Sequence, residues 1–151
     1  MLDILNVVRS VVFRYLDHMS DVYVQVSSPT LEGIFNDAAK ATFEVMIDTS
    51  TVKPTILKEV ELDADDLEQL LYKWIDHLLY LFDAESFAVS KAESRITKQK
   101  GQLPALFAKI FGDAYDPATH GQRVAVKAMT YSLMRLHKAG EGWEAYFVLD
   151  I

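Results

Sequence analysis

Residues 13–22 read Phe-Arg-Tyr-Leu-Asp-His-Met-Ser-Asp-Val, and the rest of the chain is organised around them. Apolar and polar residues alternate on both sides of this stretch, which predicts two short strands joined by a tight link. The link holds two carboxylates, Asp17 and Asp21, together with the imidazole of His18 and the hydroxyl of Ser20. A structural turn needs about one Asp or Asn, often with a Gly. The stretch therefore carries more potential ligands for a cation than a turn requires.

Length and charge narrow the possible classes of protein. The chain has 151 residues and a formal net charge of −7, and its length predicts one domain. Proteins that grip RNA or DNA through phosphates usually carry a basic patch, whereas here only Lys91, Arg95, Lys98 and Lys100 form a weak cluster. No strong direct binding of nucleic acid is expected. The absence of cysteine excludes disulfides, thiol catalysis and a cysteine-type zinc site.

The first residues predict neither a secretory signal nor a membrane span. The apolar start is interrupted by Asp3 and Arg9, lacks the basic region and cleavage site of a signal peptide, and is too short to cross a bilayer. We interpret residues 1–12 as an N-terminal extension or a lead-in to the first strand, and 13–151 as the domain. A cytoplasmic protein is expected.

Two amphipathic helices are predicted. Thr30 is a good N-cap for a helix over residues 31–46, and Asp63 for a helix over residues 64–84. The second helix has the clearest pattern in the chain, because its apolar residues follow helical spacing without a miss. They are Leu67, Leu70, Leu71, Trp74, Ile75, Leu78, Leu79 and Phe82. This stripe indicates a core helix that packs on a sheet.

Strand patterns occupy most of the remaining chain. They cover residues 56–62, 87–96, 103–111, 124–131 (with 132–136 as a continuation) and 143–151. Pro104 indicates that its strand lies at a sheet edge or starts late. Strands before, between and after two helices predict an α+β domain with a mostly antiparallel sheet and both helices packed on one face.

The last strand places a carboxylate at the end of the chain. By strand alternation Asp150 shares a face with Glu144 and Tyr146, and it lies beside the terminal carboxylate of Ile151. If the strand that starts at Asp21 pairs with this one, three or four anionic groups converge. Oxygen ligands without sulfur select Ca²⁺, Mg²⁺ or Mn²⁺. Residue types alone nevertheless favour turn and cap roles for Asp17 and Asp21, and a solvated Asp150.

Lys127 and His18 each allow more than one role. Lys127 follows Val126 in a predicted strand, where solvent exposure is the favoured interpretation and proximity to the carboxylates or to a partner is the alternative. His18 is a candidate ligand, a partner of Asp17, or a turn residue. The sequence carries no defensible Ser-His-Asp arrangement, no glycine-rich phosphate loop and no HExxH motif.

Several motifs, in order and at the right spacing, resemble the archease family. Tyr15-Leu16-Asp17-His18-Met19-Ser20-Asp21 resembles the family's tyrosine-leucine-aspartate-histidine-threonine-alanine-aspartate signature, with Met19-Ser20 in place of threonine-alanine. Further similar segments are Thr30-Leu31-Glu32, Asp48-Thr49-Ser50, Asp65-Asp66-Leu67, Val126-Lys127-Ala128-Met129-Thr130-Tyr131 and Leu149-Asp150-Ile151. Gly33 departs from the family, which commonly has a glutamate there.

The resemblance implies a function that composition does not show. Archeases are accessory proteins of the GTP-dependent RNA ligase that joins tRNA exon halves, and they promote its guanylylation and multiple turnover without ligating RNA themselves. The resemblance implies a divalent metal site, with Ca²⁺ expected ahead of Mg²⁺ or Mn²⁺, at Asp21, Asp150 and Ile151, with Asp17 as a further candidate. It implies a functional role for Lys127.

Two other functions remain open at the level of sequence. One is a metal-dependent phosphohydrolase that acts on its own through the same carboxylates, which requires turnover of a phosphate ester by the isolated protein. The other is a chaperone-like module in which the metal only pins the end of the chain.

Overall fold

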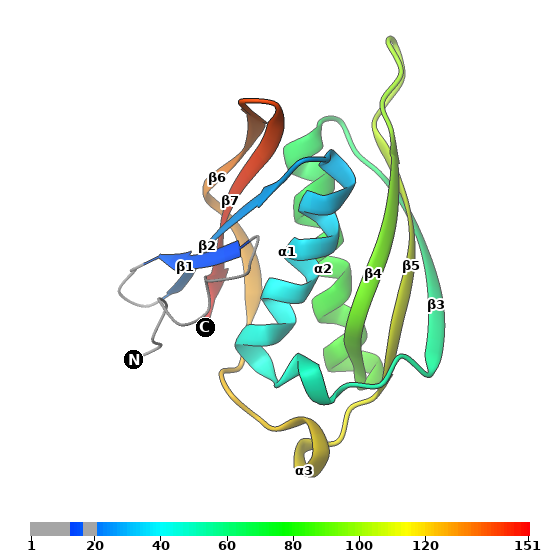
Figure 1. Ribbon diagram of the computed structural model, residues 1–151, viewed down its shortest axis with the longest axis vertical. Coiled ribbons are helices and arrows are strands. Elements are labelled where there is room, and N and C mark those ends of the chain that lie inside the picture. The colour runs from blue at the N-terminus through cyan, green and yellow to red at the C-terminus, as the bar shows by residue number, and fades with distance from the viewer. Residues whose placement is uncertain (1–12, 17–20) are drawn as a thin grey trace.

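Antiparallel sheets lie on both sides of a pair of long helices (Figure 1). In the computed structural model, which describes residues 13–16 and 21–151, one sheet has the strand order β1-β2-β7-β6 and the other β3-β5-β4. The strands are β1 (Phe13–Leu16), β2 (Asp21–Ser28), β3 (Ile56–Asp63), β4 (Phe87–Thr97), β5 (Ala105–Ala114), β6 (Ala128–Ala139) and β7 (Gly142–Asp150). The helices are α1 (Leu31–Met46), the 3₁₀ turn η2 (Thr49–Thr51), α2 (Leu67–Glu85) and α3 (Pro117–His120).

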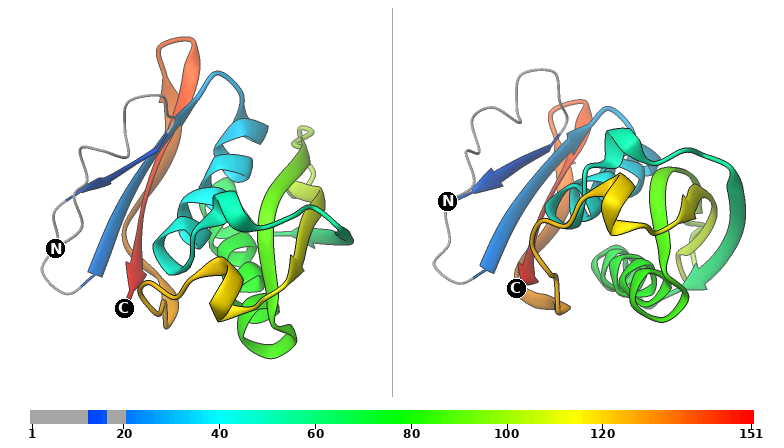
Figure 2. Two further views of the ribbon diagram at one scale, coloured as in Figure 1. Left: turned by 60° about the horizontal axis from the view of Figure 1, so that its bottom comes forward. Right: turned by 90° about the horizontal axis from the view of Figure 1, so that it is seen from below.

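Each long helix contacts strands of both sheets. Helix α1 packs on β2 and β7 on one side and on β4 on the other, and α2 packs on β6, β3 and β4 (Figure 2). The α+β class and the antiparallel pairing are thus confirmed, and both helices lie on one face of each sheet. The strands are divided between two sheets rather than joined in one. None of the helices in the described ranges is long and apolar enough to cross a membrane.

Helix α1 has the predicted bounds and cap. The Thr30 hydroxyl accepts a hydrogen bond from the backbone N–H of Gly33 at 3.0 Å. Its buried surface extends around much of the helix, since Ala38, Ala39 and Phe43 are all fully buried. This width follows from the position of the helix between two sheets.

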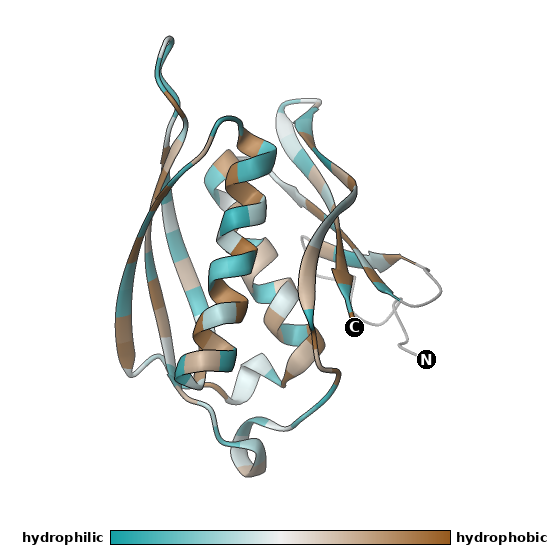
Figure 3. Cartoon of the chain, turned by 180° about the vertical axis from the view of Figure 1, so that it is seen from behind, coloured by the Kyte–Doolittle hydropathy of each residue, from teal (hydrophilic) through white to brown (hydrophobic). Residues whose placement is uncertain are grey.

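Helix α2 begins three residues later than predicted. Asp66, rather than Asp63, is the N-cap, and its side chain accepts from the N–H of Gln69 at 2.8 Å. Asp63 is the last residue of β3, where it pairs with Ala105. The predicted apolar stripe of α2 faces the core. Hydrophilic segments of the helix alternate with the hydrophobic ones along its length (Figure 3). Fully buried Trp74 donates from its indole N–H to the carbonyl of Phe35 at 2.8 Å, which joins the two helices.

The second half of the chain agrees with the predictions in outline. Strand β5 starts late, at Ala105, directly after Pro104, which confirms one of the two predicted alternatives; it is the central strand of its sheet and not an edge strand. Strand β6 begins at Ala128 rather than 124 and runs beyond 136. Helix α3 lies between β5 and β6, and Asp116 caps it.

The pairing of β2 with β7 brings distant parts of the sequence together. Val24 lies opposite Phe147, Val26 lies opposite Ala145, and all four side chains are fully buried. Ala145 and Phe147 thus lie on the face away from Asp150, as the predicted alternation of the last strand requires. Because side chains alternate, Asp21 and Asp150 lie on the opposite, outward face.

The acidic side chain of Asp37, on α1, lowers the stability of the folded protein at neutral pH. Burial raises the pKa of Asp37 to about 6, although nearby Lys40 acts in the opposite direction. The folded pKa is above the unfolded value, so folding favours the protonated carboxyl, and stability falls as pH rises from about 4 to about 6. Asp37→Asn should therefore increase the free energy of unfolding at pH 7 by about 1–2 kcal/mol, a value reduced for the partial solvent exposure of the side chain, and change it little at pH 4.

Urea denaturation between pH 4 and pH 7.5 measures this effect. Asp76→Asn, on the exposed side of α2, is the matched control. An equal change in stability at both ends of the pH range would contradict the assignment to Asp37.

Candidate functional site

Asp21 and Asp150 are direct neighbours across the β2–β7 pair. Residues at directly opposed positions of an antiparallel pair project from the same face, with Cβ atoms about 4.5–5.5 Å apart. Both side chains are partly exposed. Two like charges at this separation repel each other, and a cation between or beside them would relieve the repulsion.

Lys127 adjoins this carboxylate pair through its backbone. Its N–H donates to the carbonyl of Asp150 at 2.7 Å, and Ala128, the next residue, is the cross-strand partner of Asp150. Lys127 thus precedes β6 and is not in mid-strand as the sequence predicted; its side chain is exposed. Segments near residues 21, 127 and 150 meet at one end of the first sheet.

Of the other predicted ligands, the structure describes Ile151 alone. Ile151 follows directly on Asp150, is partly buried, and packs against the core. Asp17 and His18 lie outside the described residues. Within residues 13–16 and 21–151, no group of three or more His, Asp or Glu side chains converges to hold a metal ion. The local donors are two carboxylates and the oxygens of Ile151, a set of hard ligands whose chemistry fits Ca²⁺ or Mg²⁺.

The segment that leads to Lys127 is anchored on the C-terminal end of α1. The last four carbonyls of a helix have no partner within the helix. Here the carbonyl of Glu44 accepts from the Arg123 guanidinium at 2.9 Å, that of Val45 from the N–H of Val124 at 3.1 Å, and that of Met46 from the N–H of Arg123 at 2.8 Å. Residues 123–124 therefore act as a cap for α1 while they lead the chain towards β6.

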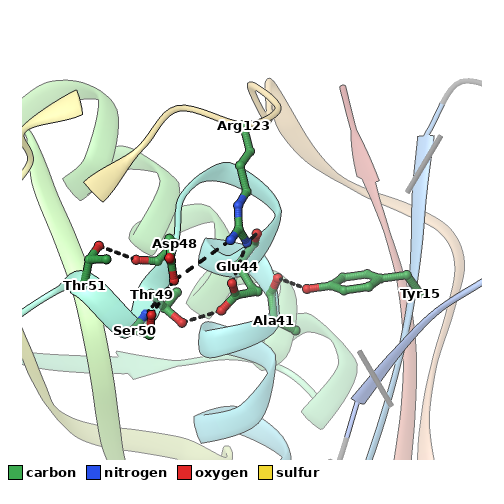
Figure 4. Close-up of polar contacts among 8 residues, drawn as sticks. All are labelled: Tyr15, Ala41, Glu44, Asp48, Thr49, Ser50, Thr51 and Arg123. Atoms are coloured by element: carbon green, nitrogen blue, oxygen red, sulfur yellow. Dashed lines mark hydrogen bonds and ion pairs between the residues drawn. The ribbon is translucent and has the colours of Figure 1, made fainter. Parts of the chain in front are cut away.

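Charged and hydroxyl side chains surround this helix end (Figure 4). Arg123 forms an ion pair with Glu44 and lies 3.9 Å from a carboxylate oxygen of Asp48, and Thr49 donates to Glu44. A hydrogen bond from the Ser50 hydroxyl, supported by one from the Ser50 backbone and by the charge of Arg123, holds the pKa of Asp48 below its ordinary value, although burial acts in the opposite direction.

Tyr15 connects this helix end to the first sheet. Its phenol donates to the carbonyl of Ala41 at 2.9 Å, and the ring is almost fully buried in β1 (Figure 4). Burial, with a smaller contribution from Glu44, raises the pKa of the Tyr15 phenol. The phenol remains protonated and donates throughout the physiological range, so it fixes β1 against α1.

The sequence did not reveal the roles of Glu44 and Arg123. They are 79 positions apart, and nothing in either local pattern indicates that they meet. One signal was available: the last turn of α1 has no basic residue to complement the helix dipole. A cation from elsewhere in the chain is favourable at such a helix end.

A second set of contacts ties the outward face of the first sheet together. The Gln25 amide donates to Glu144 at 2.9 Å and to the Tyr146 hydroxyl at 3.0 Å, and His137 lies 3.2 Å from Glu144. The Arg135 guanidinium lies 4.4 Å above the Tyr146 ring. These contacts join β2, β7 and β6 and oppose sliding of the strands.

Comparison with known proteins places the chain beside one family. The archease protein family matches residues 13–151. Protein archease of Pyrobaculum neutrophilum is 45% identical over 141 residues, which cover 92% of this chain and 95% of that protein. Protein archease of Sulfurisphaera tokodaii is 39% identical, with coverage of 92% and 98%. The solution structure of Methanobacterium thermoautotrophicum protein 1598 superposes with a TM-score of 0.78 at 29% identity, covering 93% of this chain and 99% of that one.

The cap of α1 can be tested by removing the arginine. Arg123→Ala should lower the free energy of unfolding by about 1 kcal/mol, because it removes the side-chain donor to the Glu44 carbonyl and the cation paired with the Glu44 carboxylate, in a partly solvated position. Urea denaturation measures the change. Lys53→Ala, at an exposed cation near the same loop, should have no effect. Equal stability of Arg123→Ala and the wild type would remove the capping role.

Proposed function

The chain belongs to the archease family, and from this premise we propose that it is a non-catalytic activator of a GTP-dependent RNA ligase. In this role it promotes guanylylation of the ligase and its repeated turnover in tRNA splicing or RNA repair. The observation that carries the proposal is the cross-strand pair of Asp21 and Asp150, with the backbone of Lys127 bonded to Asp150. These are the residues onto which the resemblance maps the family's functional positions.

The carboxylates hold a divalent cation in this proposal. Asp21 and Asp150 approach it from neighbouring strands, and the oxygens of Ile151 supply further donors from the same segment. Ca²⁺ is the first candidate because a flexible set of oxygen donors suits it, and Mg²⁺ or Mn²⁺ would use the same donors. When bound, the cation offsets negative charge on the nucleotide phosphates at the ligase.

The protein's own residues fix the position of this charge. The buried faces of β2 and β7 hold the two carboxylates in register, and the capped end of α1 holds the segment that carries Lys127. The Lys127 ammonium, on a long exposed side chain, is free to reach the phosphates or carboxylates of a bound partner. The net charge of −7 favours encounter with the basic RNA-binding surface of a ligase.

The activity test compares ligase guanylylation and turnover with and without the protein. We expect Asp21→Asn, Asp150→Asn and Lys127→Ala each to reduce the maximal stimulation by about tenfold or more, since they remove charged groups that act at the nucleotide. Asp76→Asn and Lys109→Ala, on other surfaces, are matched controls. Wild-type stimulation by all three site variants would refute the site, and no stimulation of a cognate ligase by the wild type would refute the function.

Cation binding has a separate readout in the isolated protein. Millimolar Ca²⁺ should raise the Tm of the wild type by mass action, and chelation should reverse the rise. Asp21→Asn and Asp150→Asn should weaken Ca²⁺ binding by at least about tenfold, because even groups behind metal ligands typically contribute that much. Calorimetric titration gives the affinity. An unchanged Ca²⁺ response in both variants would place the ion elsewhere.

A further inference from the structure

Strand β6 contains a large bulge, residues 131–134. On β6 these four residues lie between the pairs Thr130–Val148 and Arg135–Tyr146, whereas β7 has only Phe147 in the same interval. Three residues of β6 are therefore extra, and the chain must loop out of the sheet to restore the register. The β6 bulge is at an edge strand, so it disrupts the row of backbone groups that another strand would need for pairing.

The bulge holds a leucine in a strained conformation. Leu133 has φ of 59°, in the left-handed region, which is an outlier for a bulky side chain. Its side chain is 53% exposed, so burial in this protein's own core does not explain the strain. Strained, exposed apolar residues concentrate at binding surfaces, where a partner covers them.

A second large side chain of the bulge, that of Tyr131, is exposed but fixed in position. Tyr131 is also 53% exposed, and one face of its ring stacks on Tyr72 of α2, with centroids 4.1 Å apart and planes within 6°. This stacking fixes the ring without burying it. The Tyr131 side chain is therefore ordered before a partner binds, and less conformational entropy is lost on binding.

The surroundings of the bulge are acidic. Tyr131 and Met134 line a shallow pocket of 340 Å³ together with Asp66, Glu68 and Gln69 from the start of α2. The two carboxylates form an anionic rim beside the apolar bulge. The complementary surface is an apolar recess flanked by lysine or arginine, which an RNA-binding protein presents near the path of its phosphates.

The bulge adjoins the carboxylate pair. Ala128 pairs with Asp150, and Tyr131 follows three residues later on the same strand, roughly 10 Å away. We propose that the β6 bulge, with Leu133 and Tyr131 as anchors and Asp66 and Glu68 as its rim, is the surface that docks on the RNA ligase. The inference rests on the function proposed above and separates docking, by the bulge, from the chemistry at Asp21, Asp150 and Lys127.

Leu133→Gly provides a test that does not depend on damage to the fold. Glycine adopts a positive φ without strain, so the variant should keep or raise the Tm while it loses the anchor. In a guanylylation assay at increasing activator concentration, Leu133→Gly and Leu133→Asp should raise the half-maximal concentration about tenfold or more and leave the maximal stimulation unchanged. Leu57→Gly and Leu57→Asp, at a leucine 49% exposed on the other sheet, are the matched controls.

The outcomes distinguish the two proposals. If the wild type stimulates the ligase and the Leu133 variants do so at the same half-maximal concentration, the docking surface is refuted and the function stands. If the wild type does not stimulate the ligase, the function fails first. Loss of a dimer in Leu133→Asp, with ligase stimulation unchanged, would instead assign the bulge to self-association and overturn the proposal.

Discussion

Strand β7 occupies the interior of its sheet only because β2, from the opposite end of the sequence, pairs along its whole length. The register of this pair is set by the core. Val24 and Phe147 are opposite each other and fully buried, and a slip of one residue would turn every inward side chain of one strand to the outside. The same register that packs the core therefore places Asp21 against Asp150. The carboxylate pair is a consequence of packing that local preferences alone would not produce.

This placement sets two free-energy effects against each other. Burial of the inner face stabilises the sheet by roughly 25 cal/mol for each Å² of apolar surface removed from water, which amounts to several kcal/mol over the four central side chains. The repulsion of two partly solvated carboxylates is smaller, about 1 kcal/mol or less at an effective dielectric constant near that of water. The fold can hold the pair without a cation, and the cation proposed above would bind to a site that is already assembled.

Local sequence patterns predicted the helices well because capping and amphipathic spacing are local properties. Thr30 and the apolar stripe of α2 behaved as expected, whereas the cap of α2 moved from Asp63 to Asp66 because pairing with Ala105 extends β3. Local patterns could not predict contacts between residues that are far apart in the sequence. The division into two sheets, the central position of the strand after Pro104 and the contact of Arg123 with Glu44 all depend on partners far along the chain. Alternation in the last strand did predict that Asp150 lies on the face opposite Phe147, since strand parity is itself local.

The β6 bulge and the carboxylate pair lie at separate positions of the β6–β7 pair, so the two proposed roles, docking and cation binding, would not interfere with each other. A bulge confines its distortion to the residues that leave the ladder, and pairing resumes at Arg135 with Tyr146. Below the bulge, Ala128 keeps its pairing with Asp150, so strain at Leu133 does not displace the carboxylates. The contacts of Gln25 and Arg135 with Tyr146 lie on the far side of the bulge and hold the register there. Regular pairing on both sides makes the bulge a rigid projection, and its distance from the carboxylates is therefore fixed by the sheet.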